Sequence, residues 1–239
     1  MNNKKNSTKD FLFKQFAIRG GSSGMPVSTD GVLLGAWSRI DKAQRILDIG
    51  TGTGLLTLMC AQRNQNATIE AIDIDVHAMD AAAFNVEQSP WAERICLYHS
   101  DVLNHSFDAL FDTIVCNPPY FNSGEQAKSS QRATARHTDS LKHSELLARC
   151  SQLLNPEGNA NFILPLEEGR QFIETAKLDG WHLQTLCEVK PTERKAIHRL
   201  LIELVKSPCE ASLESLTIRE KDGYSDAFVT LTKDFYLKM

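Results

Sequence analysis

The fold class is indicated by residues 45–54, which read Arg45-Ile46-Leu47-Asp48-Ile49-Gly50-Thr51-Gly52-Thr53-Gly54. An apolar run typical of a buried strand leads into three glycines at alternating positions, and an apolar helical pattern follows. Alternating glycines let a backbone turn tightly against a ligand. The nicotinamide-binding pattern G-x-G-x-x-G fails because Leu55 or Thr57 stands at the third glycine position, and no Lys-Ser or Lys-Thr pair completes a phosphate-binding P-loop. These residues therefore predict a strand, a ligand-binding loop and a helix in an open α/β sheet.

From residue 45 onward, strand and helix patterns alternate, which favours a parallel sheet with right-handed crossovers. We expect strands at 11–16, 45–50, 68–73, 94–99, 111–117, 159–165, 182–189, 199–206 and 216–218. We expect helices at 31–40 (capped by Ser28, Thr29 or Asp30), 54–63, 76–88 (capped by Asp75), 140–154, 167–179 and 226–232. Residues 190–198 are too few for a parallel crossover, so the last two strands of the sheet should be antiparallel. The prediction is a Rossmann-like α/β fold with a seven-stranded, mostly parallel sheet whose last strand is antiparallel.

The chain divides into three parts on composition. Residues 1–9 are polar, basic and without periodicity, which is typical of disorder. Residues 10–206 form the predicted domain, on which the N-terminal motif at 11–40 packs. Residues 207–239 are a C-terminal extension.

Polar residues follow three further strand patterns. Asp73 ends one strand, where a carboxylate can accept from both hydroxyls of a ribose, and Asp101 follows the next. The strand pattern at 111–116 runs into Asn117-Pro118-Pro119-Tyr120. Prolines cannot extend a central strand, so this turn should present the Asn117 amide, the Pro118 carbonyl and the Tyr120 ring at the carboxyl edge of the sheet. Two acceptors and a stacking surface suit a planar –NH2 group.

The G-x-G-x-G spacing resembles the cofactor loop of class I S-adenosylmethionine-dependent methyltransferases. The resemblance implies that Asp101 accepts from the adenine amine of the cofactor and that the segment before residue 31 lies against its methionine end. The implied cofactor-binding residues are Val27, Ser28, Thr29, Asp48, Gly50, Thr51, Gly52, Gly54, Asp73, Ile74, Asp101, Val102 and Asn117.

Nearly the whole chain resembles the bacterial tRNA1(Val) (adenine-37-N6)-methyltransferase family. The features that carry the resemblance lie at residues 13–16, 25–37, 48–54, 117–121, 132–137 and 234–237. It implies methyl transfer from S-adenosylmethionine to the exocyclic N6 amine of adenine 37 in the anticodon loop of a valine tRNA. The implied catalytic residues are Asn117, Pro118 and Tyr120, and the implied RNA contacts are Tyr120, Phe121, Lys128, Arg132, Arg136 and His137. Pro26 departs from the family pattern, in which a basic residue is expected.

Composition indicates the cellular environment of the protein and whether it binds a metal. The chain has 239 residues, a net charge of −4 and no run of 18 apolar residues, so we expect no membrane span. Its six cysteines form no C-x-x-C pair and no group with histidines at metal spacing, which favours a reduced cytoplasmic protein without a metal. We further expect a monomer.

Basic residues gather in three places despite the acidic total: residues 1–19, the segment from Lys128 to Lys142, and the group Arg194, Lys195, His198 and Arg199. They can form a rim that follows phosphates, or they can be solvated surface lysines and arginines.

Three other functions remain open on sequence alone. A glutamine N5-methyltransferase of release factors uses the same tetrapeptide. Enzymes of that family are expected to carry a helical domain before the cofactor loop, and only 44 residues precede Arg45 here. A guanine N2-methyltransferase of ribosomal RNA often carries Phe where this chain has Tyr120. An RNA-binding module that has lost turnover is the third, and the intact residues Asp48, Asp73, Asp101 and Asn117 argue against it.

Overall fold

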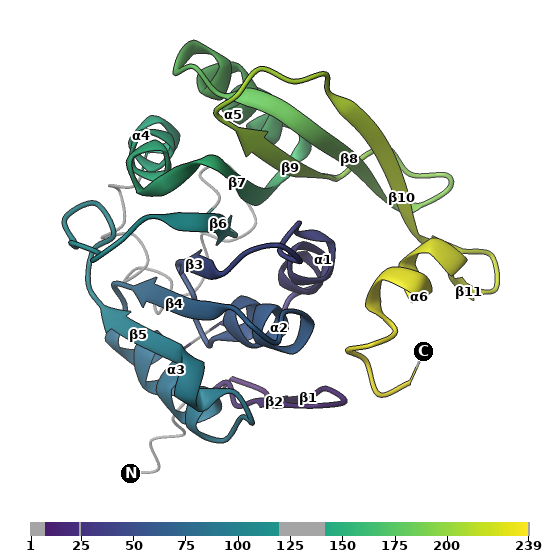
Figure 1. The fold of residues 1–239 in the computed structure, drawn as a ribbon. Helices are drawn as coiled ribbons and strands as arrows, with labels where there is room; N and C mark the ends of the chain where they lie inside the picture. Colours follow the sequence, from purple (N-terminus) through teal and green to yellow (C-terminus); the bar gives the residue numbers. More distant parts are fainter. Residues whose placement is uncertain (1–7, 24, 120–141, 239) are drawn as a thin grey trace, which may run out of the picture.

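The computed structural model describes residues 8–23, 25–119 and 142–238, which form one large sheet with helices on both faces (Figure 1). In sheet order the strands are β11 (Gly223–Tyr224), β10 (Ser212–Glu220), β8 (His182–Thr192), β9 (Arg199–Val205), β7 (Leu154–Pro165), β6 (Phe111–Cys116), β3 (Arg45–Ile49), β4 (Thr68–Asp73) and β5 (Ile95–His99). One face is covered by α1 (Thr29–Trp37), α2 (Leu55–Arg63), α3 (Val76–Glu87) and α6 (Asp226–Thr232), and the other by α4 (His143–Leu153) and α5 (Leu166–Leu178).

The strand directions confirm the predicted fold class. Strands β5, β4, β3, β6 and β7 are parallel, whereas β9 runs antiparallel to both of its neighbours, β7 and β8. The sheet extends two strands beyond the predicted seven, because β10 pairs in parallel with β8 and β11 closes the edge as a hairpin. Both added strands come from the C-terminal extension, in which the sequence predicted only a strand at 216–218 and the helix at 226–232.

The single strand predicted at 11–16 is wrong. The chain forms two short strands, β1 (Phe11–Leu12) and β2 (Ala17–Ile18), with a turn between them in which the Phe13 N–H donates to the Phe16 carbonyl at 2.9 Å. The two rings stack with centroids 4.7 Å apart, and Phe13 also forms a β-bridge to Tyr236 at the other end of the chain. The alternating aromatic residues therefore bury two rings at the ends of an exposed turn and do not form a continuous strand.

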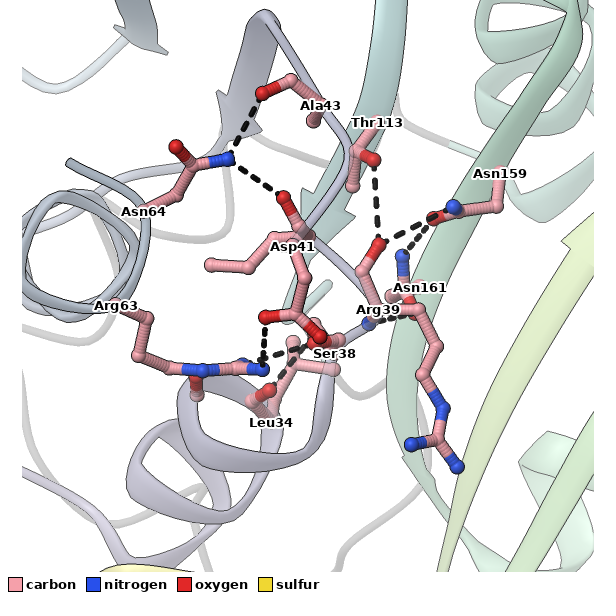
Figure 2. A network of polar contacts seen from close by, with 12 residues as sticks. Leu34, Ser38, Arg39, Asp41, Ala43, Arg63, Asn64, Thr113, Asn159 and Asn161 are labelled. Atoms are coloured by element: carbon pink, nitrogen blue, oxygen red, sulfur yellow. Dashed lines mark hydrogen bonds and ion pairs between the residues drawn. The ribbon is translucent and has the colours of Figure 1, made fainter. Parts of the chain in front are cut away.

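A polar network fixes the connection between α1 and β3 at the amino edge of the sheet (Figure 2). The guanidinium of Arg63 donates to the carbonyls of Gly35 and Ser38 at 2.9 and 2.8 Å, and the amide of Asn64 donates to those of Ile40 and Ala43 at 2.7 and 2.8 Å. From the sheet side, the hydroxyl of Thr113 on β6 and the amide of Asn159 on β7 donate to the Arg39 carbonyl, while the Arg39 N–H donates to Asn161. With its C-terminal end held here, α1 points its N-terminus toward the opposite, carboxyl edge.

The C-terminal extension shares the core of the sheet. Phe228 on α6 and Phe235 after it are almost fully buried, in the same apolar cluster as α1 and α2. The Lys14 N–H donates to the Phe235 carbonyl at 2.8 Å, and the Gln62 amide donates to the Asp234 carbonyl at 2.9 Å. The boundary at residue 206 stays a prediction.

Two further findings concern the described part of the chain. No helix in it is both long enough and apolar enough to span a bilayer. The six cysteines are unbridged thiols. Cys116 is buried in a central strand, whereas Cys96 is exposed because β5 lies at the edge of the sheet.

Candidate active site

The glycine loop after β3 adopts the left-handed backbone that its sequence predicts. Gly50, Gly52 and Gly54 have φ angles of 71°, 59° and 85°, which residues with a Cβ rarely adopt. The Gly50 and Thr51 N–H groups both donate to the Ile72 carbonyl of β4, at 2.9 and 3.2 Å. The loop therefore bends across the carboxyl ends of β3 and β4, and Gly54 is the N-cap of α2.

Asp48 is a fully buried carboxylate beneath this loop. Its Oδ2 accepts from the Thr57 N–H at 3.0 Å and from the Thr57 hydroxyl at 2.7 Å. No donor within the described residues reaches its Oδ1 with hydrogen-bond geometry. Burial raises the pKa of Asp48 to about 6, although the hydroxyls of Thr57 and Thr51 oppose that shift. An acceptor that is buried and lacks a donor suits a cationic or hydrogen-bonding ligand beside the loop.

Asp73 ties the end of β4 to the same loop. Its Oδ2 accepts from the Gly52 N–H at 2.8 Å, and its Oδ1 accepts from the Asp75 N–H at 2.9 Å. Burial raises the pKa of Asp73, and the backbone donors of Asp75 and Gly52 partly offset that effect. Each oxygen keeps a second lone pair for a ligand. The next side chain, Ile74, is 54% exposed and offers an apolar surface at the edge.

Asp101 follows β5 in a tight turn. Its Oδ1 accepts from the Leu103 N–H at 3.0 Å, and its Oδ2 accepts from the Asn104 amide at 2.7 Å. Val102 is buried behind it, and the His99 ring lies 3.1 Å from the Ile74 carbonyl. The third predicted carboxylate therefore lies at the same edge as the other two, held by its own turn.

Asn117 stands beside the glycine loop at the carboxyl end of β6. The last paired residues of β3 and β6 are Ile49 and Cys116, so Gly50 and Asn117 are the next residues along neighbouring strands. The Asn117 side chain is half-buried, Pro118 is buried and Pro119 is exposed. The predicted residues Tyr120, Phe121, Lys128, Arg132, Arg136 and His137 lie outside the described residues.

The N-terminus of α1 lies against the loop from the other side. A Cβ on Gly52 would lie 3.2 Å from the Met25 side chain, and one on Gly31 would lie 2.9 Å from Leu55. Ser28 caps α1 by accepting from the Gly31 N–H at 3.0 Å, as one of the three predicted caps. Met25 and Gly31 flank the predicted segment from Val27 to Thr29, and they pack against Gly52 of the glycine loop and Leu55 of α2.

The structure adds a contact that the sequence did not indicate. Asp30 forms an ion pair with Arg199 at the start of β9, with an Nε–Oδ2 distance of 2.8 Å and both side chains 18% exposed. The two residues are 169 positions apart, and the only signal in the sequence was the basic group around residue 198. This pair connects the motif before α1 to the antiparallel end of the sheet.

Comparisons with known proteins agree with this geometry. A family model described as the methyltransferase small domain matches residues 31–163. A Vibrio vulnificus (strain YJ016) protein named tRNA1(Val) (adenine(37)-N6)-methyltransferase is 60% identical over 232 residues, which cover 97% of each chain. A Vibrio campbellii protein of the same name is 57% identical over 239 residues and covers all of both chains. The chain belongs to this methyltransferase family. The resemblance stated from the sequence is thereby confirmed.

Solved structures support the fold of the methyltransferase. A predicted O-methyltransferase from Agrobacterium tumefaciens superposes with a TM-score of 0.66 at 18% identity, covering 86% of this chain and 96% of the other. A glycopeptide N-methyltransferase solved with S-adenosylmethionine gives a TM-score of 0.52 at 13% identity, covering 68% of this chain and 87% of the other. At these identities the likeness concerns the fold alone.

Proposed function

We propose that this methyltransferase transfers a methyl group from S-adenosylmethionine to the exocyclic N6 amine of adenine 37 in a valine tRNA. The observation that carries the proposal is the position of Asn117 and Pro118, which follow β6 at the same sheet edge as the glycine loop. The names of the relatives that match nearly the whole chain supply the substrate.

The residues at the carboxyl edge fit S-adenosylmethionine. Asp48 offers a buried oxygen without a donor, and Asp73 offers carboxylate lone pairs for ribose hydroxyls. A Cβ built on Gly50 would meet nothing within 4 Å, so the loop borders open space. We assign Val27, Ser28, Thr29, Asp48, Gly50, Thr51, Gly52, Gly54, Asp73, Ile74, Asp101, Val102 and Asn117 to this site. When bound, the cofactor supplies a methyl carbon made electrophilic by its sulfonium.

The chain's own residues then prepare the nucleophile. An adenine amine is a poor nucleophile because its lone pair is delocalised into the ring. Asn117 Oδ1 and the Pro118 carbonyl accept hydrogen bonds from its two N–H groups. These bonds hold the nitrogen with its lone pair toward the methyl carbon. As the N–C bond forms, the C–S bond breaks and the amine loses one proton to solvent. Tyr120 stacks on the base, which is worth about 1–3 kcal/mol and offsets the cost of extracting it from the loop.

The proposed reaction bears on the need for a metal, on the localisation and on the oligomeric state. The reaction needs no metal to activate the leaving group, because the sulfonium sulfur leaves as a neutral thioether. We propose a cytoplasmic enzyme that acts as a monomer, and size-exclusion chromatography with light scattering tests the second point.

The test compares Asn117→Ala with a matched control, Asn66→Ala. Asn66 is an exposed asparagine at the amino edge of the sheet, just before β4. With labelled S-adenosylmethionine and unmodified valine tRNA, Asn117→Ala should lower the single-turnover rate about 100- to 1,000-fold. Cofactor affinity should fall much less, because Asn117 is one of many residues assigned to the cofactor site. Asn66→Ala should match the wild type in both. An unchanged rate in Asn117→Ala would remove Asn117 from the mechanism, and label in protein instead of tRNA would point to a glutamine substrate.

A further inference from the structure

A cleft opens at the carboxyl edge of the sheet and adjoins the proposed cofactor site, because Ser28 and Thr29 line it too. It has a volume of about 540 Å³ and lies between the N-terminus of α1, the connection from β8 to β9, and the C-terminal residues from β10 onward. Its polar and aromatic lining includes Lys195, His198, Arg199, Arg219, Tyr224 and Tyr236. Three of these residues belong to the C-terminal extension, and three belong to the basic group recognised in the sequence.

The cleft is basic on an acidic protein. Three cations line it, and Asp30 is the single carboxylate among the described lining residues. Asp30 is paired with Arg199, so the positive charge of Lys195 and Arg219 is not balanced by another lining acid. Both of these side chains are exposed. The connection that carries Lys195 is held by hydrogen bonds from the Lys195 N–H to the Thr192 carbonyl at 3.1 Å and from the His198 N–H to the Val189 carbonyl at 2.9 Å.

An arginine and a tyrosine form a flat surface at the other side of the cleft. The Arg219 guanidinium lies 4.4 Å from the centroid of the Tyr224 ring and donates to the Tyr224 hydroxyl at 3.2 Å. The Tyr224 ring stacks on buried Phe228 with centroids 5.0 Å apart. Arginine planes and aromatic rings are the surfaces on which proteins stack unpaired RNA bases. The core therefore positions the pair, and both residues line the cleft.

The sheet places this cleft close to Asn117. Strands β8 and β10 run parallel to each other, and Thr192 at the end of β8 pairs in register with Arg219, one residue before the end of β10. Strand β9 is two positions from β6 in the sheet, and β8 is three. At about 4.8 Å between strands, this corresponds to roughly 10–14 Å across the edge to the basic residues on and before β9. Strands β10 and β11, which carry Arg219 and Tyr224, are four and five positions from β6, or roughly 19–24 Å. A single RNA strand that places its target base at Asn117 can therefore bring a nearby nucleotide to the cleft.

We propose that this cleft binds an unpaired nucleotide of the substrate tRNA other than the target adenine. Lys195 and His198 contact its phosphate, and the Arg219–Tyr224 pair stacks on its base. The cleft thereby contributes to the choice of tRNA, and the inference rests on the proposed function for the identity of the RNA.

The phosphate and stacking contacts have different signatures in binding measurements. Affinity of the full-length protein for valine tRNA is measured over a range of salt concentrations, together with cofactor affinity and the melting temperature. Lys195→Ala should weaken binding and lower the slope of log affinity against log salt by about 0.7, because one phosphate contact is lost. Tyr224→Ala should weaken binding roughly 5- to 150-fold with the slope unchanged, and Tyr224→Phe should bind as the wild type does. The control Lys177→Ala, an exposed cation on α5, should change neither.

The result that overturns the proposal is equally specific. If Lys195→Ala keeps the slope of Lys177→Ala, or if Tyr224→Phe loses as much affinity as Tyr224→Ala, the cleft does not hold a nucleotide as described. Competition by polyglutamate as strong as by tRNA would also overturn it, in favour of a general anion or acidic protein surface. Methylation of adenine 37 is measured separately. If the wild type methylates adenine 37 but the Lys195 and Tyr224 variants do not change tRNA binding as expected, only the proposed role of the cleft is refuted. If the variants change binding as expected but the wild type does not methylate adenine 37, only the proposed function is refuted.

Discussion

Replacing Asp48 with asparagine should have opposite effects on fold stability and on cofactor binding. The asparagine oxygen can accept both bonds from Thr57 that Asp48 Oδ2 accepts in the wild type. The change therefore keeps the local geometry and removes the buried negative charge. It also removes the acceptor that we assign to the cofactor.

The size of the stability effect follows from the raised pKa. Burial shifts the pKa of Asp48 from 3.8 to about 6. At 1.36 kcal/mol per unit, ionising this side chain costs the folded protein about 3 kcal/mol. Because the folded pKa is raised, the stabilising effect of the protonated form is complete below the unfolded value and is lost as the pH rises through about 6. Roughly 2 kcal/mol of that loss falls between about pH 4.5 and about pH 7.5.

The assay is urea unfolding of the cofactor-free protein at those two pH values, combined with cofactor titration at neutral pH. Relative to the wild type, Asp48→Asn should gain about 2 kcal/mol on going from the lower to the higher pH. Its affinity for S-adenosylmethionine should fall roughly 10- to 100-fold, as expected when a hydrogen bond to a charged group is lost.

Asp112 provides a control of opposite sign. Burial alone would raise its pKa, but the backbone N–H groups of Arg45 and Gln44 and the amide of Asn155 outweigh it and lower the pKa. Because its folded pKa is lowered, the ionised form of Asp112 stabilises the fold above the unfolded value of 3.8, and that stability is lost as the pH falls below it. Asp112→Asn should therefore lose stability relative to the wild type as the pH rises through about 3.8, and should change little between about pH 4.5 and about pH 7.5. If Asp48→Asn shows the same pH dependence as the wild type, the buried ionised carboxylate is not a source of instability and the reasoning is refuted.

Three further predictions concern the loop, the edge of the sheet and the C-terminal extension. Gly52→Ala should destabilise the protein by about 1–2 kcal/mol and weaken cofactor binding, because the φ of 59° at Gly52 and the nearby Met25 side chain disfavour a Cβ. Thermal melting and cofactor titration check this, and an unchanged melting temperature and affinity would contradict it. Arg199→Ala should lower the free energy of unfolding by about 1–3 kcal/mol by removing the partner of Asp30, and a double-mutant cycle with Asp30→Asn should show coupling; additive effects would count against the pair. A chain ending at residue 206 should not unfold cooperatively in urea, because Phe13 and other core residues lose the C-terminal residues that pack against them. A cooperative transition would establish 10–206 as an independent domain.

The sequence predicted those features that depend on neighbouring residues. The glycine loop, the Ser28 and Asp75 caps, the end of β4 at Asp73 and the end of β6 just before Asn117 each depend on a few consecutive side chains, and the structure confirms them. The direction of β9 followed from the shortness of the connection before it.

Features set by distant parts of the chain could not be predicted in this way. The turn at Phe13 depends on Tyr236, and the exposure of Cys96 depends on which strand lies at the edge of the sheet. The extent of β10 depends on its parallel pairing with β8, and the Asp30–Arg199 pair depends on the finished sheet order.

The measurement that tests the central claim most directly is nucleoside mass spectrometry of tRNA after reaction. The purified protein is incubated with S-adenosylmethionine and total tRNA from cells that lack adenine-37 methylation, and the modified nucleoside is located by digestion of individual tRNA species. The proposed function predicts N6-methyladenosine at position 37 of a valine tRNA, and its absence with Asn117→Ala. A methyl group on guanine N2, on protein glutamine or on no tRNA at all would contradict it.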